Sequence, residues 1–400
     1  MTEQSNKYTP SPGITSVDPV VRAKELTALI RAHADETERG RRLAAPVVDA
    51  LRSAGLFTMG LPVALGGTET SVPAALRAIE HVAYADGATG WNVMIAFDTG
   101  MLAGYLHGTQ AREMIASISQ PVVANSVFPP GRLDRVTGGY RLTGQWRFGS
   151  GCQQADVFIV GAIHADDAAS ATSASAILEK LQLAVLPAGN VTILDTWYVS
   201  GMRGTGSHDY AVDNLFVPDG LVEPLRIELP HEPGPLYAFG IFPAFGVVKA
   251  AVALGIAHHA IEAFKELASA KTPAGHSSLL RERSAVQTDL ARAQACVRSA
   301  QAFLHQTTGE IWQSVIEGNR PSTEQRAWLR LAGVDGVQRA IQAVDLVHNA
   351  AAATAIFESC PLERCFRDVH VIPAHIVVQP NVYELAGRVF LGLPPGAGLF

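Results

Sequence analysis

A block of short β-type segments lies between two blocks of helical sequence, and this order limits the folds open to the chain. Residues 119–222 contain runs such as YRLTGQWRF, DVFIVGAIHA and YAVDNLFVP, in which apolar and polar residues alternate between Gly, Pro and Asp. The pattern predicts an antiparallel sheet or barrel. The segment HADDAASATSASAIL within it is small and polar, so we expect a mobile loop there.

Helical sequence flanks this block on both sides. Residues 18–118 carry apolar residues at helical spacing with charges between them, and we expect Ser71 to cap a helix that has Pro73 in its first turn. Residues 236–400 hold about four long Ala-rich segments with short connections, which predicts a helical bundle. Residues 1–17 are polar and lack the apolar core of a signal peptide, so a disordered tail is expected.

The composition excludes several classes of protein. Of the 400 residues, 48% are apolar and 17% charged, so the chain can bury a large core and leave surface for partner subunits. A net charge of −6 gives no excess of positive charge that would bind nucleic acid. The 4 cysteines form no CxxC pair, and no uncharged apolar run reaches the length of about 18 residues that spans a membrane. These features predict a cytoplasmic protein with reduced thiols.

One strand-like run, GGYRLTGQWRFGSGCQQAD, combines aromatic and hydroxyl side chains. Trp146 and Phe148 are two residues apart and therefore expected on one face of a strand, and Ser150 lies two residues further on. Such a face suits a flat isoalloxazine ring, with the hydroxyl near its reactive nitrogen. The alternative is a sheet face buried against helices, and the spacing alone favours that alternative.

Two further segments leave their roles open. The run GMRGTGSHD does not match GxGxxG and no helical pattern follows it, which disfavours a Rossmann nucleotide loop. Trp197, just before it, is either a core aromatic or a ring-stacking residue. Arginines along 281–298 form either an exposed helix face or, near the helix start, a phosphate site aided by the helix N-terminus. These arginines are Arg281, Arg283, Arg292 and Arg298.

Two histidines, His370 and His375, follow the adjacent pair Arg367 and Asp368. A separation of five residues places the histidines about 140° apart on a helix, which is poor geometry for sharing one metal ion. No HExxH motif or third ligand accompanies them, so we expect no metal site. Arg367 and Asp368 are expected to form a local ion pair. Each histidine is then either a packed structural residue or, in a pocket, an acid or base.

Four segments in this order resemble the acyl-CoA dehydrogenase superfamily. They are ADGATGWNVMIAF, GGYRLTGQWRFGSGC, DTWYVSGMRGTGSHDYAVDNLFVP and PLERCFRDVHVIPAHIVV with the later YELAGRVFLGL. More narrowly, they resemble its two-component, reduced-flavin-dependent (group D) monooxygenase branch. The resemblance implies a mainly α fold with a central β domain: an N-terminal helical domain, a β-barrel or sandwich domain and a C-terminal four-helix bundle, assembled as a homotetramer.

The resemblance also implies roles for individual residues. His375 matches a histidine that faces substrate and flavin, and Ser150 matches a Ser or Thr close to flavin N5. The other matches are cofactor-binding: two residues on a strand along the flavin, two aromatics at or beside its ring, and a phosphate-binding arginine. These are Asn125, Ser126, Trp146, Trp197 and Arg283, with Arg281 as the alternative arginine.

The residues after the Arg-Asp pair distinguish the monooxygenase branch from the dehydrogenase branch. Acyl-CoA dehydrogenases carry a Tyr-Glu a short step later, and that Glu removes a proton from the thioester. Here the corresponding positions hold His375 and Ile376, and Tyr383-Glu384 comes about two helical turns later. At about 1.5 Å per residue, the shift moves a carboxylate by on the order of 12 Å, beyond proton-transfer reach. The resemblance therefore favours oxygenation over desaturation.

The implied activity is that of an oxygenase component. A separate NAD(P)H-flavin reductase supplies FADH₂ or FMNH₂ by diffusion, O₂ reacts to give a C4a-hydroperoxyflavin, and a hydrophobic phenol- or indole-like molecule is hydroxylated. Many phenol-hydroxylating relatives carry a second histidine where this chain has Asp98 and Thr99, which disfavours a simple phenolate. The alternatives are an acyl-CoA dehydrogenase-type FAD desaturase, an N- or S-oxygenating relative, and a helical scaffold that has lost its flavin.

Overall fold

The computed structural model describes residues 18–395 except 168–169 and 171–172, so the expected tail at 1–17 lies outside the described residues. Its N-terminal part is helical: α1 Pro19–Glu25, α2 Thr27–Ala32, α3 Ala34–Gly40, α4 Ala45–Ser53, α5 Val72–Ala85, α6 Gly87–Ala103 and α7 Thr109–Ala116. As predicted, Ser71 caps α5 by accepting a hydrogen bond from the Ala74 amide, and Pro73 lies in the first turn. Helix α6 is buried along most of its length because neighbouring elements surround it.

The central block forms a 7-stranded sheet of order β5-β6-β2-β1-β3-β4-β7. The strands are β1 Val123–Val136, β2 Gly139–Trp146, β3 Val157–His164, β4 Gln182–Pro187, β5 Thr192–Leu194, β6 Asp209–Pro218 and β7 Val222–Pro224. The sequence predicted an antiparallel sheet or barrel, and five of the neighbouring strand pairs are antiparallel, but β1 and β3 pair in parallel. The loop expected at 164–178 also contains the start of helix α8, Ala174–Lys180, which Ser173 caps.

The C-terminal part is a bundle of long helices. Its elements are α9 Pro235–Phe239, α10 Ile241–Ala270, α11 Ser284–Ile316, α12 Thr323–Ala351, α13 Pro361–Val371 and α14 Asn381–Phe390. Helix α10 is long and apolar enough to cross a membrane by length and composition, but 83% of its most apolar window is buried inside the protein. It therefore serves as the core helix of the bundle, packed against α12, α5 and α6.

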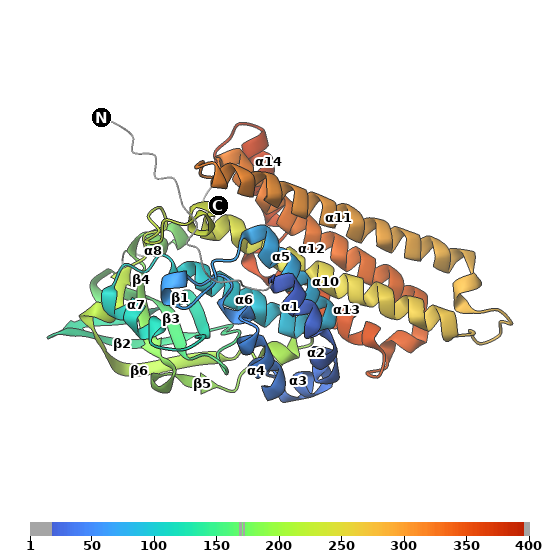
Figure 1. The fold of residues 1–400 in the computed structure, drawn as a ribbon, viewed down its shortest axis with the longest axis horizontal. Helices are drawn as coiled ribbons and strands as arrows, with labels where there is room; N and C mark the ends of the chain where they lie inside the picture. The colour runs from blue at the N-terminus through green and yellow to red at the C-terminus, as the bar shows by residue number, and fades with distance from the viewer. Residues whose placement is uncertain (1–17, 168–169, 171–172, 396–400) are drawn as a thin grey trace.

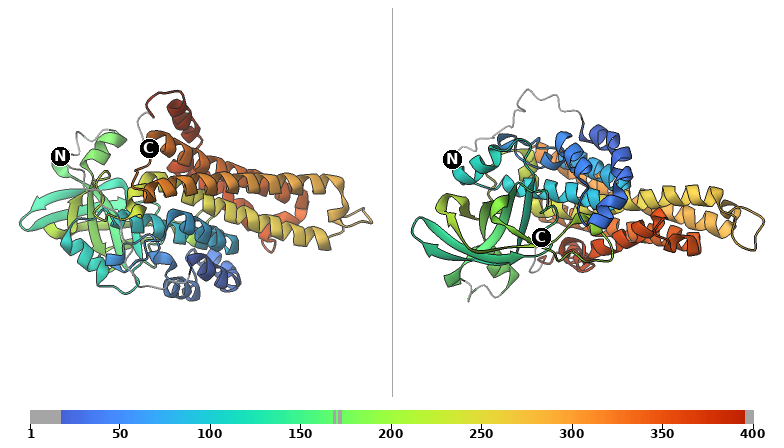
Figure 2. Two further views of the ribbon diagram at one scale, coloured as in Figure 1. Left: turned by 45° about the horizontal axis from the view of Figure 1, so that its top comes forward. Right: turned by 90° about the horizontal axis from the view of Figure 1, so that it is seen from below.

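The sheet occupies one end of the molecule and the bundle extends away from it (Figure 1, Figure 2). The N-terminal helices lie against both, and α6 packs against β1 of the sheet and against α10 of the bundle (Figure 1). The connection from α10 to α11 lies at the far end of the bundle (Figure 1). The junction of sheet, α6 and bundle therefore brings together residues that are far apart in the sequence.

Candidate functional site

Ser150 lies on a sharp turn directly after β2. Phe148 adopts a left-handed backbone conformation (φ 58°), and the Gly149 amide donates to the His208 carbonyl at 3.0 Å. A side chain on Gly149 would come within 2.6 Å of Tyr210, so the turn requires glycine there. The turn buries the Ser150 hydroxyl, which accepts a hydrogen bond from Trp91 Nε1 at 3.0 Å. The hydroxyl is thus fixed by a side chain from α6.

A chain of hydroxyl groups determines where the Ser150 proton points. Ser150 Oγ lies 2.6 Å from Ser207 Oγ, which lies 2.7 Å from Thr205 Oγ1. Thr205 donates its own proton to the Met202 carbonyl at 2.8 Å. Because each hydroxyl has one proton, Ser207 donates to Thr205 and Ser150 donates to Ser207. Since one lone pair of Ser150 accepts from Trp91, one lone pair remains for a ligand.

His375 faces Trp91 from the bundle side. Helix α13 ends at Val371, a short 3-10 turn containing Pro373 follows, and His375 is extended (φ −74°, ψ 127°). Its ring meets the Trp91 ring edge to face, with centroids 5.9 Å apart. Burial, and then the charges of Lys249 and Arg330, hold the pKa of His375 well below its ordinary value, so the ring is neutral near pH 7.

The two histidines do not share a helix, so the angle expected from continuous helical geometry does not apply. His370 remains on α13, where Nδ1 donates to the Phe366 carbonyl at 2.7 Å and Nε2 lies 3.3 Å from Asp345. Among the residues that the structure describes, no group of three His, Cys, Asp or Glu side chains could hold a metal ion. His370 and His375 thus have separate surroundings.

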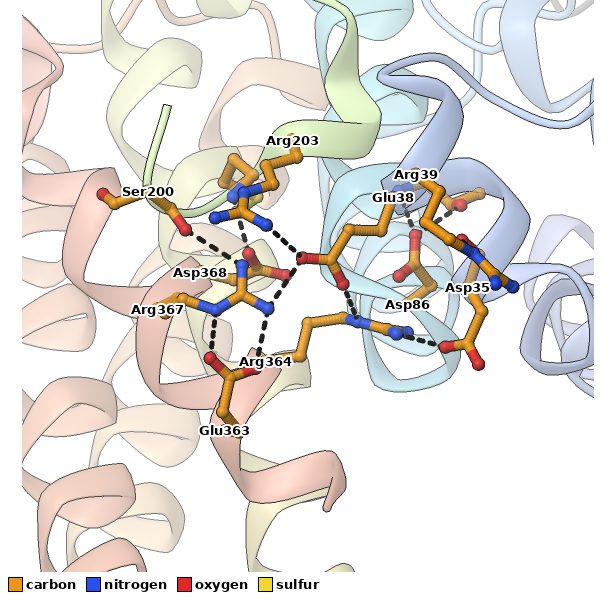
Figure 3. A network of polar contacts seen from close by, with 12 residues as sticks. Asp35, Glu38, Arg39, Asp86, Ser200, Arg203, Glu363, Arg364, Arg367 and Asp368 are labelled. Carbon is orange, nitrogen blue, oxygen red and sulfur yellow. Dashed lines mark hydrogen bonds and ion pairs between the residues drawn. The ribbon is translucent and has the colours of Figure 1, made fainter. Parts of the chain in front are cut away.

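The local ion pair expected between Arg367 and Asp368 was wrong (Figure 3). Adjacent residues point about 100° apart on a helix, so each finds other partners. Arg367 binds Glu363 at 2.5 Å and Glu38 at 2.7 Å. Asp368 accepts a hydrogen bond from the Met202 amide at 2.6 Å, and burial raises its pKa to about 7. These contacts fasten α13 to α3 and to the loop that carries the hydroxyl chain.

Trp197 and Phe148 form an aromatic edge near Ser150. The Trp197 amide donates to His208 Nδ1 at 3.2 Å, and its indole donates to the Met202 carbonyl at 3.1 Å. Its ring lies edge to face with Phe148, with centroids 6.3 Å apart. The Phe148 side is open, with 71% of the residue exposed. This edge offers apolar surface to a flat ligand.

The other predicted cofactor residues are placed differently. On β1, Asn125 Nδ2 donates to Thr99 Oγ1, and Ser126 Oγ donates to the Arg147 carbonyl at 3.1 Å or to that of Phe128. Both side chains are half-buried. Arg283 is exposed and is the N-cap residue of α11. The connection from α10 to α11 lies at the far end of the bundle from the sheet (Figure 1). Within one chain, Arg283 therefore does not approach Ser150.

Trp146 requires a correction. The residue is fully buried in the core of the sheet, stacked on Tyr210 with centroids 5.7 Å apart, and its indole donates to the Gly161 carbonyl at 2.9 Å. It has no exposed surface for a flavin in this conformation. Strand β2 ends at Trp146, and the left-handed backbone of Phe148 breaks the alternation that predicted a shared face. The exposed aromatic is Phe148 instead.

Several residues of this junction were not predicted from the sequence. Ser207 and Thr205 stand in a glycine-rich connection with no hydroxyl pattern of their own. Lys249 was detectable as a lone charge within an apolar helical run, FGVVKAAVALG. Its ammonium lies 2.6 Å from Asp98 Oδ2, and both residues are buried. Trp91 was part of a quoted motif, but its contacts with Ser150 and His375 required the folded chain.

The order of N-terminal helices, central sheet and C-terminal helical bundle is that of the acyl-CoA dehydrogenase fold. The family model "Acyl-CoA dehydrogenase, N-terminal domain" matches residues 23–114, and "Acyl-CoA dehydrogenase, C-terminal domain" matches residues 247–380. Indole-3-acetate monooxygenase of Pseudomonas putida is 30% identical, with 92% of each chain covered. The FADH(2)-dependent resorcinol hydroxylase, oxygenase component, of a Rhizobium species is 26% identical, with 99% of each covered.

A solved structure agrees with these relatives. The HsaA monooxygenase of M. tuberculosis superposes with a TM-score of 0.84 at 25% identity, covering 96% of this chain and 99% of that one. The chain belongs to the acyl-CoA dehydrogenase superfamily, in its two-component flavin-dependent monooxygenase branch. It is an oxidoreductase of the oxygenase-component type, and its cofactor is reduced flavin.

Proposed function

We propose that this chain hydroxylates a hydrophobic phenol- or indole-like molecule in the cytoplasm, as a homotetramer supplied with FADH₂ or FMNH₂ by a separate NAD(P)H-flavin reductase. The observation that carries the proposal is the contact of Trp91 with both Ser150 and His375. It joins a hydroxyl on the sheet side to a neutral histidine on the bundle side. The named substrates of the relatives, indole-3-acetate and resorcinol, support an aromatic substrate.

The residues at the junction fit a flavin ring. Phe148 and Trp197 present apolar aromatic surface, and Ser150 lies beyond them with one lone pair available. Bound reduced flavin would supply the activation of O₂, and the protein would position the ring and exclude water. Asn125 and Ser126 would lie along the ring on β1. Arg283 would reach the flavin phosphate of a second subunit, since it is remote from the sheet of its own chain.

Ser150 would accept a hydrogen bond from N5–H of the reduced flavin. Its own proton is donated to Ser207, and one of its lone pairs accepts from Trp91. N5 carries a hydrogen only when the flavin is reduced, whereas oxidised N5 is an acceptor and needs a donor. The hydroxyl chain therefore favours the reduced cofactor, as expected for an enzyme that receives reduced flavin by diffusion.

His375 would hold a proton at Nε2. Its Nδ1 accepts a long hydrogen bond of 3.4 Å from the Val377 amide, which favours the neutral tautomer with hydrogen on Nε2. In this tautomer the ring donates to an oxygen atom that gains negative charge during the reaction. The opposite tautomer would accept a proton from a substrate O–H or N–H. Its lowered pKa keeps the ring neutral for either role.

The Tyr-Glu pair that the desaturase alternative would use lies in an exposed position. Tyr383 and Glu384 lie on α14, where Tyr383 Oη is 3.4 Å from Asp335 of α12 and Glu384 is exposed to solvent. Helix α14 lies beside the ends of α11 and α12 (Figure 1). A carboxylate there is in water, so it lacks the buried surroundings that tune a catalytic base.

An oxygen-consumption assay tests the proposal. The protein is mixed with FADH₂ or FMNH₂ generated by an added reductase, with and without indole or phenol, and oxygen uptake, H₂O₂ and product are measured. We expect oxygenated product that depends on reduced flavin and on the protein. Bleaching of bound oxidised FAD by an acyl-CoA without oxygen, and no oxygenated product, would replace the proposal with the desaturase.

A further inference from the structure

Helices α6 and α10 bury an ion pair in the protein interior. Lys249 Nζ lies 2.6 Å from Asp98 Oδ2, and the two residues are only 1% and 3% exposed. Removing two charges from water costs more than a buried pair usually regains, so apolar residues of similar volume would stabilise the fold at least as well. The stability of the fold therefore does not explain the pair, and a role toward a ligand is worth testing.

The pair lies beside the proposed active site. Asp98 is seven residues after Trp91 in α6, so the two side chains lie on the same helix face about two turns apart. The next residue, Thr99, is tied to Asn125 of β1. On the bundle side, α10, which carries Lys249, packs against α6 and against the 3-10 turn Ile376–Val378 that directly follows His375. Asp98 therefore lies on the same face of α6 as Trp91, next to the residue bonded to β1, and is paired with the helix that packs beside His375.

One carboxylate oxygen of Asp98 accepts a hydrogen bond and the other does not. Oδ2 accepts from Lys249, whereas Oδ1 has no hydrogen-bond partner among the residues that the structure describes. Met94 Sδ lies 3.5 Å from the ammonium and the Phe245 ring centroid lies 5.1 Å from it, so the pair has apolar neighbours. A buried acceptor without a donor is costly, and a ligand that brings a donor would remove that cost.

We infer that Asp98 Oδ1 is a substrate subsite that accepts a hydrogen bond from a ring N–H or O–H, so that the enzyme selects neutral donor-bearing aromatics over anions. This inference rests on the proposed function. Lys249 fixes the carboxylate through Oδ2. The lone pairs of Oδ1 disfavour a phenolate or carboxylate, because such a group brings a second acceptor and no donor. Burial raises the pKa of Asp98 to about 6, so near pH 7.5 the group is a carboxylate and an acceptor.

Binding measurements without oxygen test the subsite. Protein with bound reduced flavin is titrated anaerobically by calorimetry with indole, phenol, 1-methylindole and benzofuran, of which the last two lack the donor. We expect indole or phenol to bind roughly tenfold or more tightly than benzofuran, as expected for a hydrogen bond to a charged acceptor. Indole and phenol together distinguish an N–H donor from an O–H donor.

Asp98→Asn provides the discriminating variant. The amide oxygen would stay on Lys249 and the NH₂ group would take the place of Oδ1, turning an acceptor into a donor. The preference should then be lost or reversed in favour of benzofuran. If this variant does not fold, Asp98→Leu with Lys249→Met removes both charges and should bind all four probes alike. Glu80→Gln, at the pair with His305 between α5 and α11, is the matched control and should keep the preference.

Two results overturn the inference: equal affinities for indole, phenol and benzofuran in the native enzyme, or a preference that survives in Asp98→Asn or in the double variant. Failure of the proposed function is seen separately. It would appear as no reduced-flavin-dependent oxygenation by the native enzyme, whatever the binding order of the probes.

Discussion

Replacing Ser207 with alanine should change the redox preference of the flavin site. In the native enzyme Ser150 donates to Ser207 and has one free lone pair, which suits N5–H of reduced flavin. Oxidised flavin needs a hydrogen-bond donor at N5. If Ser150 turned its proton toward N5, Ser207 Oγ, a buried acceptor, would lose its donor. Ser207→Ala removes that competing acceptor. The Ser150 proton then becomes available to oxidised N5.

The size of the effect is that of one hydrogen bond. A typical net value of about 0.5–1.5 kcal/mol corresponds to a roughly two- to tenfold gain in the affinity for oxidised flavin relative to reduced flavin. The dissociation constants of both redox forms are measured, the reduced form anaerobically. Thr308→Val, at another buried hydroxyl on α11, is the control and should leave the ratio unchanged. An unchanged ratio in Ser207→Ala would refute the assigned direction of the hydroxyl chain.

Three further predictions concern other residues. His375→Asn should lower the product formed per oxygen consumed by about tenfold or more and raise H₂O₂, while the affinity for flavin is kept. The control Glu384→Gln should change neither the product yield nor the H₂O₂ yield. Equal product yields for His375→Asn and the native enzyme would remove His375 from the chemistry. Burial lowers the pKa of His259 to about 4, so between about pH 6.5 and 4 this histidine binds a proton only in the unfolded chain. Acidification through that range should therefore lower the free energy of unfolding by roughly 2–3 kcal/mol. His259→Gln should not show this loss. Urea unfolding of both proteins at pH 7 and pH 4.5 measures this, and parallel losses would contradict it. Arg283→Ala should weaken reduced-flavin binding by the oligomer roughly five- to tenfold, and an unaltered dissociation constant would exclude Arg283 from the phosphate site.

The sequence predicted what depends on local pattern. The order of helical, β and helical blocks is a matter of periodicity, and Ser71 with Pro73 is a local start signal, so both agree with the structure. Ser150 was singled out by its spacing from Trp146 and Phe148 and by the family resemblance, and its role toward the flavin stays a prediction. The parallel pairing of β1 with β3 could not be predicted, because strand pairing depends on residues far apart in the chain.

The errors at the site have physical causes. Period-two spacing says that alternate residues share a face but not which face is buried, and the left-handed Phe148 then separates it from Trp146. Asp98 was noticed only as a departure from a family pattern, because its partner Lys249 comes from a helix about 150 residues later. Buried polar networks are assembled by tertiary packing, and a single sequence does not reveal their partners.

The most direct measurement is an anaerobic titration with FADH₂ and FMNH₂ followed by rapid mixing with oxygen. The account predicts that reduced flavin binds more tightly than oxidised flavin. It also predicts a transient absorbance, distinct from both free redox states, before oxidised flavin appears. Oxidation in one phase at the rate of free flavin, or FAD that stays tightly bound when oxidised and is bleached by an acyl-CoA, would contradict the account.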